Sequence, residues 1–219
     1  MDTDTFQNEV SGVDFYSADL ETLSGGYTGS GTATSIDIGR KDAKGSLTTD
    51  RGIFNVDISG IADSARIVTA TLSIKVSASE GASSPSLMCE LSTESWLKDS
   101  SNKPTWETRN GVANWSALGG SMAGDRVLIL GHMPQSVAVH DFDLTWLASI
   151  AHRKHAGDFN FVLYSEHESV AAERYITIDS CEGTTKPLLT ITSAVGNGAL
   201  SKTASAGMSR RGKNRFKKI

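Results

Sequence analysis

Apolar and polar residues alternate along much of the chain between residues 12 and 193, as in strands that bury one face. The clearest run is 67–76, where every second side chain from Ala70 to Val76 is apolar. Other runs rich in β-branched residues lie between turn residues at short intervals, which favours an antiparallel sandwich. About ten strands are predicted, at 13–16, 35–38, 52–58, 67–76, 87–92, 126–130, 136–142, 159–164, 175–178 and 188–192.

Because inward-facing rows must fill the space between two layers, the same alternation predicts the core. We expect eight side chains to be buried there: Phe54, Val56, Ile58, Leu72, Ile74, Phe161, Leu163 and Leu189.

One segment, 144–155, has the periodicity of a helix instead. Its apolar residues recur at i, i+3, i+4 and i+7: Leu144, Leu147, Ala148 and Ala151. Asp143 is a candidate N-cap, because its carboxylate can accept a free backbone N–H, and Gly157 is a candidate stop. The sequence predicts a single short helix near 143–156.

Composition divides the chain into three segments. Residues 1–11 are polar without periodicity and are interpreted as an N-terminal arm. Residues 12–193 are predicted to form one all-β, antiparallel jelly-roll sandwich, with a Gly-rich loop at 24–31. Residues 194–219 are rich in Gly, Ala and Ser and then basic, which predicts an extended C-terminal arm.

Charge is divided unequally between these segments. The chain has 21 basic and 25 acidic residues, a net charge of −4. Seven basic residues and no acidic residue fall in 202–219, so the remaining residues carry 14 basic and 25 acidic side chains, a net charge of −11. A basic arm on an acidic body favours an acidic partner surface, with nucleic acid as the less favoured partner. The candidate partner-binding residues are Arg210, Arg211, Lys213, Arg215, Phe216, Lys217 and Lys218.

The composition also bears on the compartment. Two cysteines, Cys89 and Cys181, cannot form a disulfide framework in a chain of this length, so reduced and buried thiols are expected. The first residues lack the basic start and apolar stretch of a signal peptide, and no run of 18 apolar residues predicts a membrane span.

The candidate chemical groups are sparse. His152 and His155 have i, i+3 spacing, but the adjacent Arg153 and Lys154 disfavour a metal, so a solvated helix end is expected. The segment 166–168 (Glu-His-Glu) is predicted to be a solvated loop, and the pair Asp141 and Asp143 a surface charge and a helix cap. No nucleophile–base motif, phosphate loop or metal-ligand spacing is present, so no enzymatic activity, cofactor or metal is predicted.

Four tryptophans allow two interpretations. Trp96, Trp106, Trp115 and Trp146 could form a platform on which sugar rings stack, but core packing is the favoured interpretation. Two or more exposed aromatic residues on one concave face would instead favour sugar binding.

The order and spacing of several short motifs resemble the DNRLRE family of jelly-roll domains. Residues 67–74 are similar to its I-x-x-A-x-L-x-L strand, and residues 142–145 to its F-D-V-T motif before a helix. The other similar segments are 12–16, 27–29, 35–40, 52–61, 94–96, 104–106, 161–163, 176–178 and 186–191. The resemblance covers about residues 12–193 and implies a jelly-roll fold.

Domains of this family occur in phage particles and in bacterial surface and carbohydrate-binding proteins. With a basic arm and no export signal, the chain is expected to be a structural protein of a virus particle, that of a tailed bacteriophage, assembled in the host cytoplasm. A capsid decoration or cement protein, itself a homo-oligomer, is the favoured role, contacting capsid, collar or tail proteins and no membrane. The alternatives are a neck, collar or tail component and a carbohydrate-binding module of a cell-surface or phage adsorption protein.

Overall fold

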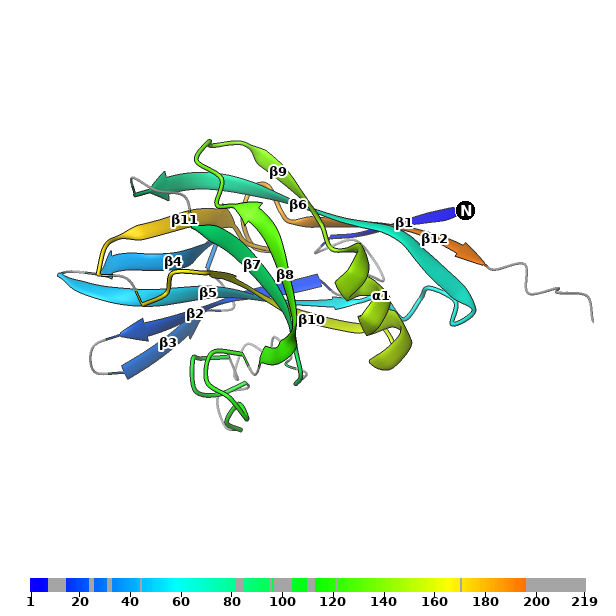
Figure 1. Ribbon diagram of the computed structural model, residues 1–219, viewed down its shortest axis with the longest axis horizontal. Coiled ribbons are helices and arrows are strands. Elements are labelled where there is room, and N and C mark those ends of the chain that lie inside the picture. Colours follow the sequence, from blue (N-terminus) through cyan, green and yellow to red (C-terminus); the bar gives the residue numbers. More distant parts are fainter. Residues whose placement is uncertain are drawn as a thin grey trace, which may run out of the picture.

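The computed structural model describes residues 1–7, 15–23, 26–30, 33–43, 45–81, 85–94, 96, 104–109, 113–120, 122–169 and 171–195. They form an all-β protein with one short helix, α1 (Thr145–Lys154) (Figure 1). The strands are β1 (Asp2–Phe6), β2 (Phe15–Leu23), β3 (Gly26–Ser30), β4 (Ser35–Ala43), β5 (Ser46–Asp57), β6 (Ala65–Glu80), β7 (Ser86–Ser92), β8 (Met122–His132), β9 (Val139–Asp143), β10 (Asp158–Ser165), β11 (Arg174–Asp179) and β12 (Leu188–Val195).

All described strands pair antiparallel in one curled sheet, which folds over into the two layers of a jelly-roll sandwich. The order is β1-β12-β6-β11-β4-β5-β10-β7-β8, while β2 pairs with β3 and β5, and β9 pairs with β6. The first half of β6 pairs with β12 and the second half with β11, so this long strand joins the two layers. Figure 1 shows β1, β6, β9 and β12 above β2, β3, β4 and β5.

The main core lies between the two layers. All eight side chains predicted to be there are buried. Phe54 of β5 and Phe161 of β10 are directly paired across the strands, and their rings stack with centroids 5.0 Å apart. Phe15 packs edge-on against Phe54, and Phe159 lies 4.8 Å from Phe161 between centroids. These aromatic contacts add geometric preference to the apolar area that the layers bury.

A second, smaller core covers the outer face of the same sheet. Ile53 and Val162 point away from Phe54 and Phe161 and are fully buried, because Trp96, Trp106 and Trp115 pack over them. Strands β5 and β10 therefore bury both faces, which explains why adjacent residues such as Ile53 and Phe54, or 161–163, are all apolar.

The helix packs against β6, and the apolar stripe that its periodicity predicts is buried: Leu144, Leu147, Ala148 and Ala151. Leu144 occupies the N-cap position. Oδ1 of the preceding Asp143 accepts a hydrogen bond from the Thr145 amide at 2.8 Å. The prediction of Asp143 as the N-cap is therefore wrong by one residue, although its carboxylate does accept a backbone N–H at the start of the helix. Gly157 follows with φ of +85°, which glycine adopts readily.

Two strands were not predicted. Asp2–Phe6, within the expected N-terminal arm, pairs with β12 as β1, and Gly26–Ser30, within the expected Gly-rich loop, pairs with β2 as β3. Residues 1–5 are exposed and only Phe6 is buried, so β1 adds backbone hydrogen bonds to the sheet without alternating burial. Of the expected C-terminal arm, residues 194–195 end β12, and residues 196–219, with all seven candidate partner-binding residues, lie outside the described residues.

No helix among the described residues has the length and apolar character needed to cross a membrane.

Candidate functional site

Three of the four tryptophans are packed as the core interpretation predicts. Trp96, Trp106 and Trp115 are buried, whereas Trp146 is 46% exposed, so core packing is wrong for that residue. Trp146 lies two positions after Leu144, a rotation of about 200° around the helix, which turns it away from the buried stripe. With one exposed tryptophan, the described residues bring no pair of tryptophans together as a sugar-stacking platform.

The prediction of a solvated helix end is wrong for His152. Its side chain is buried, and its Nε2 lies 3.3 Å from the carbonyl oxygen of Ala65 at the start of β6. His155 is half-buried, with Nε2 3.2 Å from Nη1 of Arg126. The helix therefore presents the two histidines to different neighbours.

The acidic positions singled out in the sequence have structural partners. Glu166 and His167 are exposed as predicted, but Glu168 forms an ion pair with Arg51, so its part of the loop is not simply solvated. Asp141 accepts a hydrogen bond from Ser73 at 2.5 Å. Hydrogen bonds from the Thr145 side chain and amide lower the pKa of Asp143 below its ordinary value.

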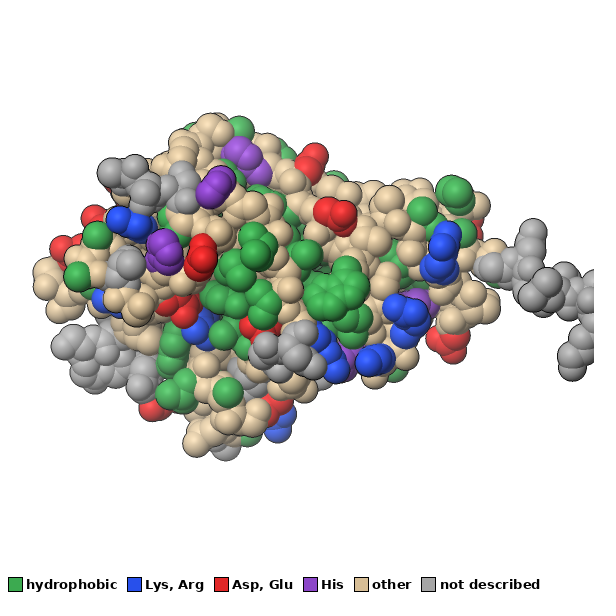
Figure 2. All heavy atoms as spheres, viewed as in Figure 1, with side chains coloured by type: hydrophobic (Ala, Val, Ile, Leu, Met, Phe, Trp, Pro, Cys, Tyr) green, Lys and Arg blue, Asp and Glu red, His purple; other side chains and the backbone are tan. Residues whose placement is uncertain are grey.

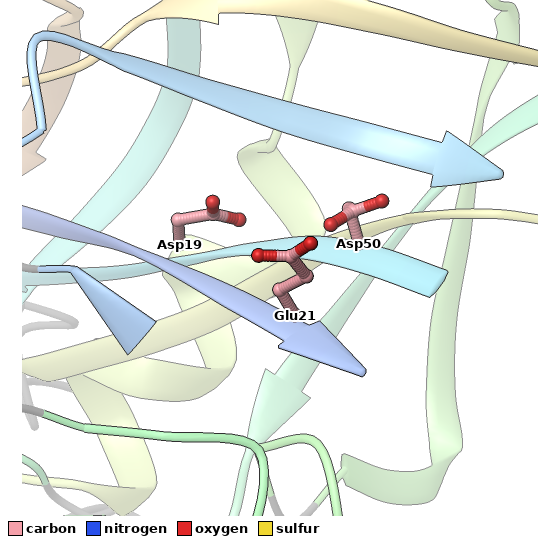
Figure 3. Close-up of side chains that lie close together, drawn as sticks. All are labelled: Asp19, Glu21 and Asp50. Carbon is pink, nitrogen blue, oxygen red and sulfur yellow. The ribbon is translucent and has the colours of Figure 1, made fainter. Parts of the chain in front are cut away.

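A different group of carboxylates comes together, from the paired strands β2 and β5 (Figure 3). Asp19 and Glu21 lie on the same face of β2, and Glu21 is directly opposite Asp50 of β5. One oxygen from each of the three lies within 4.8 Å of the others. We refer to Asp19, Glu21 and Asp50 as the carboxylate cluster.

Burial and mutual repulsion make charge costly in this cluster. Asp50 is 2% exposed and accepts a hydrogen bond from Thr48 Oγ1 at 2.8 Å. Oδ1 of Asp19 is shielded from solvent and has no hydrogen-bond partner. Burial, followed by the charge of Asp50, raises the pKa of Asp19 to about 8. Burial also raises the pKa of Asp50 to about 7, with Glu21 adding to the shift and Thr48 opposing it.

A cationic side chain lies near the cluster without joining it. Lys41 of β4 forms an ion pair with Asp37, four residues earlier, and its ammonium lies 5.1 Å from the ring centroid of Tyr175. Its charge lowers the pKa of Asp19 and of Asp50, but less than burial raises them. The cluster therefore keeps a tendency to bind protons near neutral pH.

Three neighbouring carboxylates can relieve their repulsion by sharing protons or by coordinating a hard cation such as Ca²⁺ through oxygen. The cluster was not predicted, because the first strand was expected to end at residue 16, before Asp19 and Glu21. The alternation of Asp19, Leu20 and Glu21 was the available signal. That no group binds a metal tightly remains a prediction.

The two cysteines, by contrast, follow the prediction. Cys89 and Cys181 are buried and neither forms a disulfide, and burial raises the pKa of Cys89 well above its ordinary value. A buried thiol with a raised pKa is a poor nucleophile.

The chain matches no protein-family model and no curated protein sequence. The resemblance to DNRLRE domains therefore depends on the short motifs alone, and the structure independently establishes an all-β jelly-roll sandwich.

Proposed function

We propose that the chain is a structural subunit of a virus particle, that of a tailed bacteriophage. In this proposal it decorates or cements the capsid, after assembly in the host cytoplasm. The sandwich serves as a rigid body, and the basic C-terminal segment contacts an acidic surface of a neighbouring capsid, collar or tail subunit.

The observation that carries the proposal is the position in the fold of Val195, after which the basic segment begins. The register pairs Asp2 with Ser193, so the first strand and the last described strand meet at the same tip of the molecule (Figure 1). The 24 residues after Val195 hold the seven basic side chains of the C-terminal region. A fully extended chain of that length spans about 80 Å, enough to reach a neighbouring subunit.

The distribution of charge along the chain supports a second copy of the same protein as a partner. Outside residues 202–219 the chain carries a net charge of −11, so the body of one copy is complementary to the basic segment of the next. This complementarity is also the argument for a homo-oligomer. Attraction between such surfaces steers association and is weakened by salt.

The carbohydrate-binding alternative loses its main support, because Trp96, Trp106 and Trp115 pack inside the protein. A neck, collar or tail component would dock through the same charged surfaces as a decoration protein, but it would be present in a different copy number. Mass spectrometry of purified particles distinguishes them, because a decoration protein is present in many copies and a neck or tail protein in few.

The test removes the charge of the basic segment without shortening it. Replacing Arg210, Arg211, Lys213, Arg215, Lys217 and Lys218 by Gln should abolish incorporation into particles and leave the melting temperature of the isolated protein unchanged. The matched control exchanges Arg and Lys at the same six positions, which keeps the charge, and should be incorporated normally. Normal incorporation of the Gln variant would refute the proposed role of the segment.

A further inference from the structure

A cavity of about 290 Å³ lies between the start of β6 and the second half of α1. Its walls come from three residues of each element: Ala65, Arg66 and Ile67 of β6, and Ser149, His152 and Arg153 of α1. Two of these six side chains are arginines and none is acidic. The cavity is therefore a positively charged site on a body that is acidic overall.

The fold holds the two walls in fixed relation. The Leu144 amide donates to the Ala70 carbonyl at 2.8 Å, and the Ala70 amide donates to Thr145 Oγ1 at 2.9 Å. Two turns further along the helix, His152 Nε2 reaches the Ala65 carbonyl. Because α1 is attached to β6 at both places, the cavity between them does not depend on a loop.

The two guanidinium groups at the cavity have N–H donors that bond to no described residue. Arg153 uses its Nε to donate to the Ser149 carbonyl at 3.0 Å, which leaves both of its terminal amino groups available. The Arg66 guanidinium makes no hydrogen bond or ion pair with any described residue, while its backbone pairs with Ala194 of β12. Figure 2 shows Lys and Arg side chains gathered over the part of the molecule that holds α1.

A purely structural explanation accounts for part of this arrangement. His152, Arg153 and Lys154 occupy the last turn of α1, where cations interact favourably with the helix dipole. That explanation does not extend to Arg66, which belongs to a strand and still contributes to the same cavity. Arg66 and Arg153 are both exposed, so a ligand in the cavity could contact both guanidinium groups.

We propose that this cavity binds an oxyanion group, a phosphate or a carboxylate. The planar guanidinium fork matches the oxygen spacing of both groups and forms charge-assisted hydrogen bonds with them. The volume accommodates one such group together with ordered water. This site lies on the sandwich itself, so the proposal is independent of the virion role and of the basic C-terminal segment.

The test measures binding of inorganic phosphate and of acetate to the full chain, by titration calorimetry at constant ionic strength maintained with chloride. Arg66→Gln and Arg153→Gln should each weaken binding by about tenfold, since each removes a hydrogen bond to a charged group. Lys154→Gln is the matched control, because it removes the same charge from the same helix outside the cavity, and should change the affinity less than about twofold.

The two probes separate the sources of the oxyanion. Saturable binding of phosphate alone assigns a phosphate group, and binding of acetate alone assigns a carboxylate such as an acidic side chain of another protein. The proposal is refuted if neither anion binds saturably, or if all three variants weaken binding equally, which would indicate general charge attraction. Unchanged melting temperatures of the variants confirm that they fold.

Discussion

Arg51 and Glu168 form a two-pronged ion pair, with Nε and Nη2 of the arginine each 2.6 Å from a carboxylate oxygen. The same guanidinium donates to the Gly119 carbonyl at 3.0 Å and lies 4.5 Å from the ring centroid of Trp106. One buried side chain thus attaches β5 to the turn after β10 and to the segment that covers the outer face of the sheet. The second core depends on this attachment.

Removing either partner of this pair should destabilise the protein. Glu168→Gln should lower the free energy of unfolding by about 2 kcal/mol and Arg51→Ala by about 3 kcal/mol, because each leaves buried polar groups without a charged partner. Urea unfolding followed by tryptophan fluorescence measures both changes. Arg109→Ala is the control: Arg109 is 40% exposed and 3.9 Å from Glu94, so its loss should cost less than about 1 kcal/mol.

The carboxylate cluster should make stability fall as the pH rises. The pKa values of Asp19 and Asp50 in the folded protein lie above the ordinary 3.8. Between about pH 4 and 8 the folded state therefore binds more protons than the unfolded chain, and this contribution is lost as the pH passes through about 7 and 8. Asp19→Asn should raise the free energy of unfolding at pH 8.5 by about 2 kcal/mol relative to the unmodified protein.

The pH dependence of that difference is the decisive measurement. At pH 4 the gain from Asp19→Asn should nearly vanish, because Asp19 is then protonated in the folded state. Asp63→Asn, at an exposed aspartate, should show no such dependence. A gain of the same size at both pH values would show that charge on Asp19 is not the cause.

The same proton affinity predicts weak metal binding at neutral pH, since a cation must displace protons from Asp19 and Asp50. Dialysis against a chelator at pH 7 should leave the melting temperature unchanged. A rise in melting temperature with millimolar-range Ca²⁺ in the unmodified protein, absent in Asp19→Asn, would contradict this expectation.

Gly157 should not tolerate a side chain. Its φ is +85°, and a Cβ there would lie 2.5 Å from the backbone nitrogen and Cα of Ser59. Gly157→Ala should lower the free energy of unfolding by about 2 kcal/mol or more in urea unfolding. At Gly60 a Cβ would meet nothing within 4 Å, so Gly60→Ala should change stability by less than about 0.5 kcal/mol. Equal effects at both positions would refute this account of Gly157.

Alternation in the sequence was sufficient to predict the main core. Phe54, Leu72 and Phe161 are buried because each belongs to a run in which one face must be apolar. The second core was less accessible to prediction, since Ile53 and Val162 face outward on their strands and are covered only by a segment distant in the sequence. Local periodicity carries no information about that cover.

The candidate sites were harder to predict than the second core, because they depend on contacts between segments that are distant in the sequence. The pairing of Glu21 with Asp50 follows from the register of β2 on β5, and the burial of His152 follows from the contact of α1 with Ala65. The i, i+3 spacing of His152 and His155 indicated the helix but not which side of it would face β6. Strand β1 was unpredictable for another reason, because its backbone pairing needs no apolar side chains.

The position of β12 constrains the order in which the chain can fold. This strand, the last among the described residues, lies between β6 and β1 and pairs with both. Strand β1 is therefore synthesised well before its neighbour, which exists only after residues 188–195 have been added. Until then the edge of β6 that β12 will cover is open to other chains, so translation rate and the concentration of nascent protein should influence its yield.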